Sequence, residues 1–184
     1  MLTYNDVKFM TLAIVESQKS SCCSQKIGAV IAMPINGELT LVSEGYNGAV
    51  GRSGYRIDCC AVNRSLLNTE GKLTSINRPL HSEWSDRNEI HSEMAAILNA
   101  QKKGIVLKYA TLYTTQSPCN QCAKHIGFIA AYEGISRVVY LDKYDRGGDK
   151  WEKHLIARGI EVVEFDKSKL DFINLDKLVF NNNE

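Results

Sequence analysis

The sequence predicts an α/β protein in which helices cover both faces of a mixed five-stranded sheet. Two observations lead to this prediction. Residues 27–33 and 39–46 are strand-like and are joined through Asn36-Gly37, a strong signal for an antiparallel hairpin. After residue 90, helix-like and strand-like stretches alternate, which favours parallel pairing of the later strands.

Local patterns predict the individual elements. Residues 4–19 carry apolar side chains at helical spacing, next to two residue types that cap helices, Thr3 and Asn5. A second helix begins at His91 and ends at Gly104, and a third begins at Pro118-Cys119 and ends before Gly134. The remaining expected elements are strands at 110–115, 135–141 and 160–165, helices at 150–158 and 170–180, and a frayed tail at 181–184.

Composition and charge limit the class of protein. With 184 residues and 44% hydrophobic composition, the chain is expected to form a single globular domain over residues 1–184. The 22 basic and 21 acidic residues are spread along the sequence, so no polycationic surface for nucleic acid is expected and a small substrate is favoured. No apolar run is long enough to cross a bilayer, and the first residues lack a signal-peptide pattern, which predicts a cytoplasmic protein without membrane contact.

Two short motifs predict a metal centre. His91 and Glu93 lie at the start of one expected helix, and Cys119 and Cys122 lie at the start of another, where thiolates are favoured. One imidazole and two thiolates leave the fourth zinc position open for water, as in a catalytic site, and Glu93 is placed to accept a proton from that water. A lone C-x-x-C also fits a redox pair or two buried thiols, but joined to H-x-E and Pro118 it is the signature of zinc-dependent nucleobase deaminases.

Residues 48–90 lack sustained periodicity, and connections of that length inside a compact domain need something to hold them. Four protein donors would form a closed structural zinc site there. The alternative is that the cysteines are buried as small hydrophobic residues and that the histidine lies on the surface. The candidate ligands are Cys22 or Cys23, Cys59 or Cys60, His81 and Glu89.

The chain resembles the deoxycytidylate (dCMP) deaminases, in particular the phage-type members of this group within the zinc-dependent cytidine deaminase superfamily. H-x-E and P-C-x-x-C are shared across that superfamily, whereas the double cysteines and His-Ser-Glu-Trp are narrower. The resemblance implies a cytidine-deaminase-like three-layer fold. It is carried by Cys22-Cys23-Ser24, residues 26–31, Gly45-Tyr46-Asn47-Gly48, Cys59-Cys60, His81-Ser82-Glu83-Trp84, residues 88–93, Ser117-Pro118-Cys119 and Cys122-Ala123-Lys124.

The resemblance implies hydrolysis of dCMP to dUMP and ammonia, which supplies dUMP for thymidylate synthesis. Glu93 would be the proton shuttle. The catalytic zinc would be held by His91, Cys119 and Cys122, and a second, structural zinc that staples residues 48–90 would be held by Cys22, Cys59, His81 and Glu89.

The resemblance also implies contacts to nucleotides. Asn47 would meet the substrate sugar, although an Asn-Gly turn residue is the alternative, and Ser92, where relatives usually have alanine, would contact the base through its backbone. Tyr144 would lie at the mouth of the site and pack on the base, with an ordinary surface aromatic as the alternative. An allosteric site for dCTP, the activator, and dTTP, the inhibitor, with Mg²⁺ on the triphosphate and within a homohexamer, would use Gly45, Tyr46, Asn47, Gly48 and Arg52.

Two other functions compete with this interpretation. A deaminase of another base, such as tRNA adenosine or a riboflavin precursor, would use the same zinc chemistry, but the balanced charge argues against RNA and residues 81–93 favour dCMP. A non-catalytic zinc-binding module would leave Glu93 without a role. For a viral protein, the expected location is the host cytoplasm.

Overall fold

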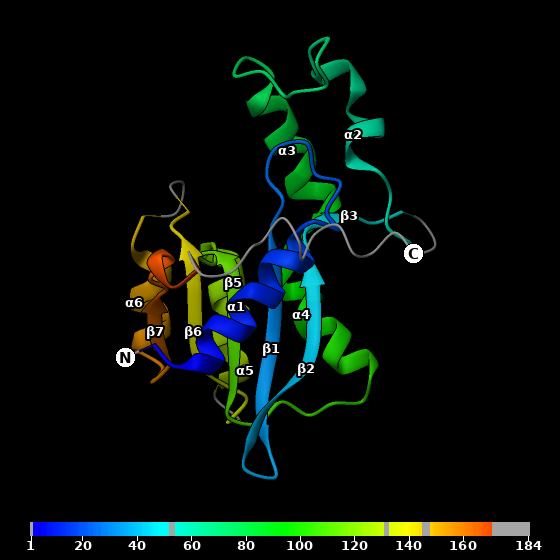
Figure 1. Cartoon of the computed structure of the whole chain (residues 1–184). Helices are drawn as coiled ribbons and strands as arrows, with labels where there is room; N and C mark the ends of the chain where they lie inside the picture. Colours follow the sequence, from blue (N-terminus) through cyan, green and yellow to red (C-terminus); the bar gives the residue numbers. More distant parts are fainter. Residues whose placement is uncertain (1, 52–53, 131–132, 145–147, 171–184) are drawn as a thin grey trace.

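The central feature of the structure is a mixed five-stranded sheet with the strand order β2-β1-β5-β6-β7 (Figure 1). The structure is a computed structural model and describes residues 2–51, 54–130, 133–144 and 148–170. β1 pairs antiparallel with β2 and with β5, while β5, β6 and β7 are parallel, so the predicted mixed sheet is confirmed. The strands are β1 (Gly28–Ile35), β2 (Glu38–Tyr46), β5 (Ala110–Gln116), β6 (Ile135–Asp142) and β7 (Glu161–Glu164).

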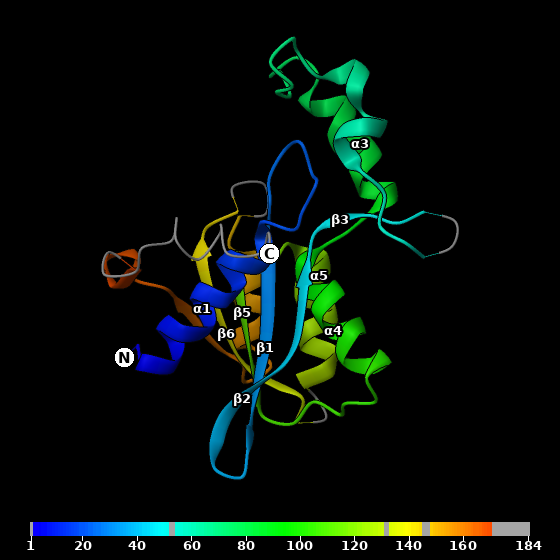
Figure 2. The same ribbon diagram turned by 45° about the vertical axis from the view of Figure 1, so that its right-hand side comes forward.

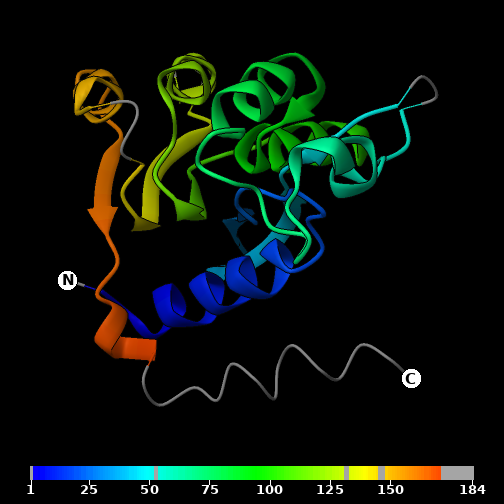
Figure 3. The ribbon, with the colours of Figure 1, turned by 90° about the horizontal axis from the view of Figure 1, so that it is seen from above.

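Helices cover both faces of this sheet, as predicted. Seen from above, α1 (Tyr4–Ser17) lies on one face, and the other face carries α4 (Ser92–Lys102), α5 (Asn120–Ala130) and α6 (Lys150–Ile156) (Figure 3). The short 3-10 helix η2 (Lys167–Leu170) contacts α1. The chain therefore forms three layers, helix, sheet and helix. No helix in the described part of the chain is both long enough and apolar enough to cross a membrane.

The central strands are buried on both faces because alternate side chains enter two different cores. Ile31 and Leu112 pack in the core beneath α4, α5 and α6, whereas Val30 and Tyr113 pack beneath α1 with Phe9. Each of these side chains is at most 1% exposed. Full burial of one such aliphatic side chain contributes about 1.5–3 kcal/mol, so the two cores fix the sheet between its helices.

Two glycines let the helices approach the sheet closely near one end of it. A Cβ at Gly28 would lie 2.2 Å from the Ala13 carbonyl oxygen of α1, and a Cβ at Gly45 would lie 2.3 Å from the Ala96 nitrogen of α4. Any larger residue at either position would push a helix away from the sheet. Gly45 therefore has a packing role.

The element boundaries agree with the predictions to within a few residues. Asn36 and Gly37 have φ of 52° and 85°, the positive values that a tight hairpin turn requires. The first helix ends at Ser17 and not at residue 19, and β7 begins one residue later than predicted. Of the predicted helix 170–180, only residue 170 is described, at the end of η2, and the predicted tail lies outside the described residues.

Residues 54–88 form an extension that projects from the upper end of the sheet in Figures 1 and 2. It leaves and returns through two short antiparallel strands, β3 (Gly48–Ala49) and β4 (Glu89–Ile90). Between them lie α2 (Cys59–Val62), the 3-10 helix η1 (Arg64–Leu66) and α3 (Arg78–Asn88). These helices were not predicted. α3 is largely polar and buries only His81, so it has no apolar stripe to recognise.

The buried carboxylate of Asp6 connects α1 to the sheet through hydrogen bonds from β5 and β6. Asp6 is 0% exposed, and its oxygens accept hydrogen bonds from the Arg137 guanidinium at 2.5 Å, from the Tyr113 hydroxyl at 3.0 Å and from the Thr3 nitrogen at 2.7 Å. Burial raises the pKa of Asp6, but the hydrogen bonds from Arg137 and Thr3 outweigh it, and the net pKa is lowered.

Replacing Asp6 by asparagine is expected to lower the free energy of unfolding at pH 7 by about 3 kcal/mol, because the half-buried Arg137 guanidinium loses its buried carboxylate partner and keeps only the exposed Glu161. The folded-state pKa of Asp6 lies below the unfolded value, so its contribution is present above about pH 4 and is lost as the pH falls through the folded pKa. The difference in the free energy of unfolding between parent and variant, measured by urea titration, should therefore decrease as the pH falls. Asp149→Asn, at an exposed ion pair with Lys153, is the matched control. A difference in the free energy of unfolding that stays constant down to pH 3 would contradict this account.

Candidate active site

The predicted metal ligands meet at the upper end of the sheet. β5 and β6 end there, and α4 and α5 begin there, a location where sheets of this class commonly bind ligands. His91 is the N-cap residue of α4, and Cys119 directly precedes α5. Both helices begin one residue later than predicted, which leaves His91 and Cys119 just before the first turn.

The geometry of His91, Cys119 and Cys122 fits a tetrahedral metal. The Nδ1 atom of His91 lies 3.4 Å from each sulfur. Ligands on zinc with Zn–N of about 2.1 Å and Zn–S of about 2.3 Å lie about 3.6 Å apart at tetrahedral angles. Among the described residues this group has three donors, the composition of a site that keeps one position open.

Hydrogen bonds among these three side chains shift their pKa values strongly. The hydrogen bond to Cys119 raises the pKa of His91 to about 9, whereas hydrogen bonds from Cys122 and from His91 lower the pKa of Cys119 to about 3. The shared hydrogen bond with Cys119 and burial raise the pKa of Cys122. Cys119 is therefore a thiolate, the form in which cysteine binds metals.

Glu93 lies in the first turn of α4 and is 4% exposed. One of its oxygens accepts a hydrogen bond of 3.0 Å from the Ser92 hydroxyl. Burial raises the pKa of Glu93, as does the nearby Cys119, while His91 opposes the rise. A buried carboxylate with a raised pKa is suited to carrying a proton during a reaction. The hydroxyl of Ser92 thus supports Glu93, a contact that the resemblance did not predict.

A second group of donors lies beside the first. Cys22, Cys59, His81 and Glu89 place one donor atom each within 4.8 Å of one another, and the Cys59 sulfur lies 3.3 Å from His81 Nε2. Three of the four side chains are buried. Oε1 of Glu89 is buried and has no hydrogen-bond partner in the described part of the chain, as expected for an oxygen that binds a metal.

The structure also distinguishes between the adjacent cysteines. The Cys23 sulfur is 3.9 Å from that of Cys59 but does not belong to the four-residue group, and the Cys60 thiol donates a hydrogen bond to the Ser21 carbonyl. The geometry therefore favours Cys22 and Cys59, the residues that the resemblance implied and that the sequence pattern left open.

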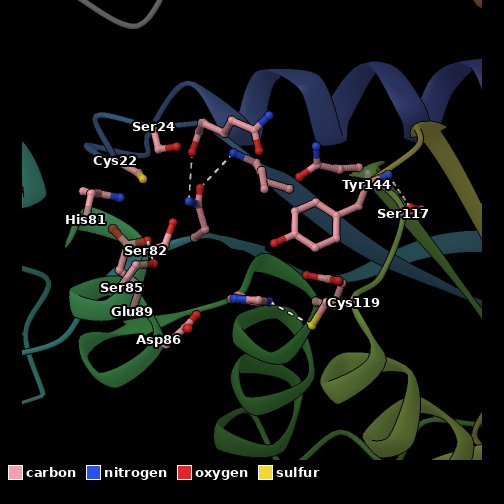
Figure 4. A pocket seen from close by; sticks show the side chains of 16 residues that line it. Cys22, Ser24, His81, Ser82, Ser85, Asp86, Glu89, Ser117, Cys119 and Tyr144 are labelled. Atoms are coloured by element: carbon pink, nitrogen blue, oxygen red, sulfur yellow. Dashed lines mark hydrogen bonds between the residues drawn. The ribbon is translucent and has the colours of Figure 1, made fainter. Parts of the chain in front are cut away.

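A cleft joins the two groups. It has a volume of about 670 Å³, open solvent included. Tyr144 points into it beside Cys119, while side chains of α3 line the opposite wall (Figure 4). The backbone nitrogen of Tyr144 donates a hydrogen bond of 2.8 Å to the Ser117 hydroxyl, which fixes the segment after β6. The cleft residues are Cys22, Ser24, Gln25, Ile27, Asn47, His81, Ser82, Ser85, Asp86, Glu89, His91, Glu93, Gln116, Ser117, Cys119 and Tyr144.

Asn47 lines the cleft and also bonds the backbone of two other residues that line it, Ile27 and Gln25. Its side-chain oxygen accepts a hydrogen bond from the Ile27 nitrogen at 2.8 Å, and its amide nitrogen donates to the Gln25 carbonyl at 2.9 Å. An amide nitrogen carries two hydrogens, so a second donor remains to meet a ligand. Asn47 is 5% exposed and is oriented by the backbone, not by a turn of its own.

The residues assigned by resemblance to an allosteric site lie at the junction of β2 and β3. Arg56 donates hydrogen bonds to the Gly48 carbonyl at 2.6 Å and to the Tyr46 carbonyl at 2.9 Å, and its guanidinium lies 4.7 Å from the centre of the Tyr46 ring. Arg52 lies outside the described residues. The allosteric role of this segment stays a prediction.

Sequence reasoning missed the wall that α3 contributes. Ser82, Ser85 and Asp86 line the cleft together with Glu89. Their spacing is i, i+3, i+4 and i+7, which places them on one helical face. A search for polar residues at helical spacing, and not only for apolar ones, would have found this wall.

Comparison with known proteins agrees with this geometry. Residues 3–142 match the family model described as the cytidine and deoxycytidylate deaminase zinc-binding region. The chain therefore belongs to the cytidine and deoxycytidylate deaminase family, whose members are zinc-binding enzymes.

Within that family the chain is similar to dCMP deaminases of phages. It is 36% identical to the deoxycytidylate deaminase of Enterobacteria phage T4, over 92% of this chain and 94% of that protein. It is 37% identical to the phage T2 enzyme over 91% and 95%. The crystal structure of dCMP deaminase from cyanophage S-TIM5 in complex with dCMP and dUMP matches with a TM-score of 0.63 and 25% identity, over 90% of this chain and 99% of that one.

Proposed function

We propose that this protein hydrolyses dCMP to dUMP and ammonia. The observation that carries the proposal is a buried carboxylate, Glu93, beside three zinc-type donors at the inner end of a cleft. The choice of dCMP is supported by the phage relatives and by the S-TIM5 neighbour, which is described in complex with dCMP and dUMP.

The residues of the chain divide the reaction between them. A zinc ion held by His91, Cys119 and Cys122 would supply a water of lowered pKa at the open position. Glu93 takes one proton of that water and delivers it to the ring nitrogen N3, which makes C4 of the cytosine electrophilic, and the water oxygen forms a bond to C4. Glu93 then transfers the second proton of the water to the 4-amino group, the C4–N bond breaks, and ammonia leaves while C4 keeps the oxygen as the carbonyl of dUMP. Tyr144 packs on the base, and the remaining amide hydrogen of Asn47 meets the sugar.

A second zinc would be structural. Cys22, Cys59, His81 and Glu89 provide four protein donors, which leaves no position for a reactant. Because α3 carries His81 and also lines the cleft, a metal there would fix one wall of the substrate site.

The family resemblance supports a proposal about regulation and assembly. We propose that dCTP, with Mg²⁺ on its triphosphate, activates the enzyme, that dTTP inhibits it, and that both act near Gly45, Tyr46, Asn47, Gly48 and Arg52 within a homohexamer. Such control suits an enzyme that supplies dUMP for thymidylate synthesis in the cytoplasm, the host cytoplasm for a viral protein.

The test is release of ammonia from dCMP by the zinc-loaded protein, measured alone and with each effector. We expect dUMP and ammonia in equal amounts, more turnover with dCTP and less with dTTP. A turnover rate that neither dCTP nor dTTP changes would contradict the regulatory part of the proposal. Absence of dUMP would contradict the catalytic part. Light scattering of the same samples reports whether the particles are hexamers.

A further inference from the structure

The described lining of the cleft is acidic and would repel the phosphate of a nucleotide unless a cation lies at the rim. Its described lining includes the carboxylates of Asp86, Glu89 and Glu93 but no lysine or arginine. A nucleoside monophosphate carries a doubly charged phosphate, and buried or half-buried phosphates are normally met by basic side chains.

Arg78, the first residue of α3, is a cation among the described residues that reaches this rim. Its Nη1 atom donates a hydrogen bond of 3.2 Å to the hydroxyl of Ser24, which lines the cleft from the segment between α1 and β1. The guanidinium therefore crosses from the extension to the body of the protein at the edge of the cleft.

The face of α3 that lines the cleft continues to Arg78. Ser82 and Ser85 follow Arg78 by four and seven residues, so the three lie on one helical face. A neighbouring depression adjoins the cleft, because Ser82 and Asp86 line both. Its other lining residues are Ser75, Arg78, Pro79 and Glu83, and Glu83 is paired with Arg87.

Charge changes sign along this face. Asp86 lies eight residues after Arg78, about 12 Å further along the helix axis, toward His91. The carboxylates thus lie at the inner end, with the zinc-type donors and Glu93, and the guanidinium lies at the outer end. A nucleotide carries its base and its phosphate on opposite sides of its sugar, so this polarity matches a substrate whose base points inward.

We propose that Arg78, together with the Ser24 hydroxyl, binds the 5′-phosphate of the substrate and sets the preference for nucleotides over nucleosides. This proposal rests on the proposed function, and it adds the group that recognises the phosphate. The planar guanidinium presents paired donors to two phosphate oxygens, while Ser24 holds it in place when the cleft is empty.

The test compares Arg78→Gln with the parent chain on matched pairs that differ only in the phosphate. The readouts are kcat/KM for dCMP and deoxycytidine, and the Kd of dUMP and deoxyuridine by titration calorimetry. Loss of a charge-assisted contact should weaken both nucleotide values by about 10- to 100-fold and leave the nucleoside values unchanged. Arg78→Lys should restore part of the loss, since it keeps the charge without the paired donors.

Two control variants isolate the effect. Arg87 lies on α3 nine residues further along, on the opposite face, in an exposed ion pair with Glu83, so Arg87→Gln should change none of the four values. Lys26 is an exposed cation close in sequence to Ser24, and Lys26→Gln tests whether it holds the phosphate instead. Zinc content equal to the parent's shows that each variant keeps the extension folded.

A preference for nucleotides over nucleosides that survives Arg78→Gln would overturn the assignment. If that preference is lost in Lys26→Gln instead, Lys26 holds the phosphate. A parent chain that neither binds dUMP nor converts dCMP would instead contradict the proposed function, so the two failures are distinguishable.

Discussion

Replacing Glu93 by glutamine is expected to abolish deamination of dCMP while zinc remains bound. Glutamine has nearly the same shape but can neither accept the proton of the water nor deliver one to N3. General acid–base catalysis contributes about 10²- to 10⁴-fold, and Glu93 acts in more than one step, so a loss of at least about 10³-fold is expected. Ammonia release and zinc content are measured on the same preparation.

Ser92→Ala is the matched control for that variant. It removes the hydroxyl that donates a 3.0 Å hydrogen bond to Glu93 but leaves the carboxylate in place. Turnover should stay within about 10-fold of the parent value, since one hydrogen bond to a charged group is worth about 1.5 kcal/mol. Full activity in Glu93→Gln would remove Glu93 from the mechanism.

Replacing His81 by alanine is expected to release one zinc ion per chain and to loosen the extension before the sheet unfolds. The extension joins the body through the short pair β3 and β4, and it buries few apolar side chains of its own. Since the binding energy of a structural metal is folding energy, limited proteolysis within residues 54–88 should accelerate by at least about 10-fold. Turnover of dCMP should fall as well, because α3 forms a wall of the cleft.

Glu83→Gln serves as the control for His81→Ala. Glu83 lies two residues from His81 on the same helix, but its side chain is 64% exposed and forms an ion pair with Arg87. It should leave the zinc content and the cleavage rate unchanged. Cleavage of His81→Ala no faster than that of the parent chain would show that no metal holds the extension.

The sequence was sufficient where a local pattern reports directly on structure. Asn36-Gly37 predicted the hairpin because a tight turn needs positive φ at both positions. The alternation of strands and helices after residue 90 predicted the parallel strands, and ligand types at helix starts predicted the group of His91, Cys119 and Cys122. Each of these inferences involves residues that are close in sequence or chemically distinctive.

The rest depends on distant contacts that no local pattern encodes. Bonding of the Cys60 thiol to the Ser21 carbonyl, and the approach of Cys22 to Cys59, are set by how the extension folds back on the body. α3 was missed because the residues that recur at helical spacing along it are polar and line the cleft, not a core. The support that Ser92 gives Glu93, and the reach of Arg78 to Ser24, likewise appear only in three dimensions.

The most direct test of the central claim is the rate of ammonia release from dCMP by the zinc-loaded protein, measured beside cytidine, free adenosine and the pyrimidine precursor of riboflavin. We expect the highest kcat/KM for dCMP, with dUMP as the product, because Glu93 and the three metal donors lie at the inner end of a cleft whose outer rim carries Arg78. Zinc-loaded protein that leaves dCMP unchanged and deaminates adenosine or the riboflavin precursor would contradict it.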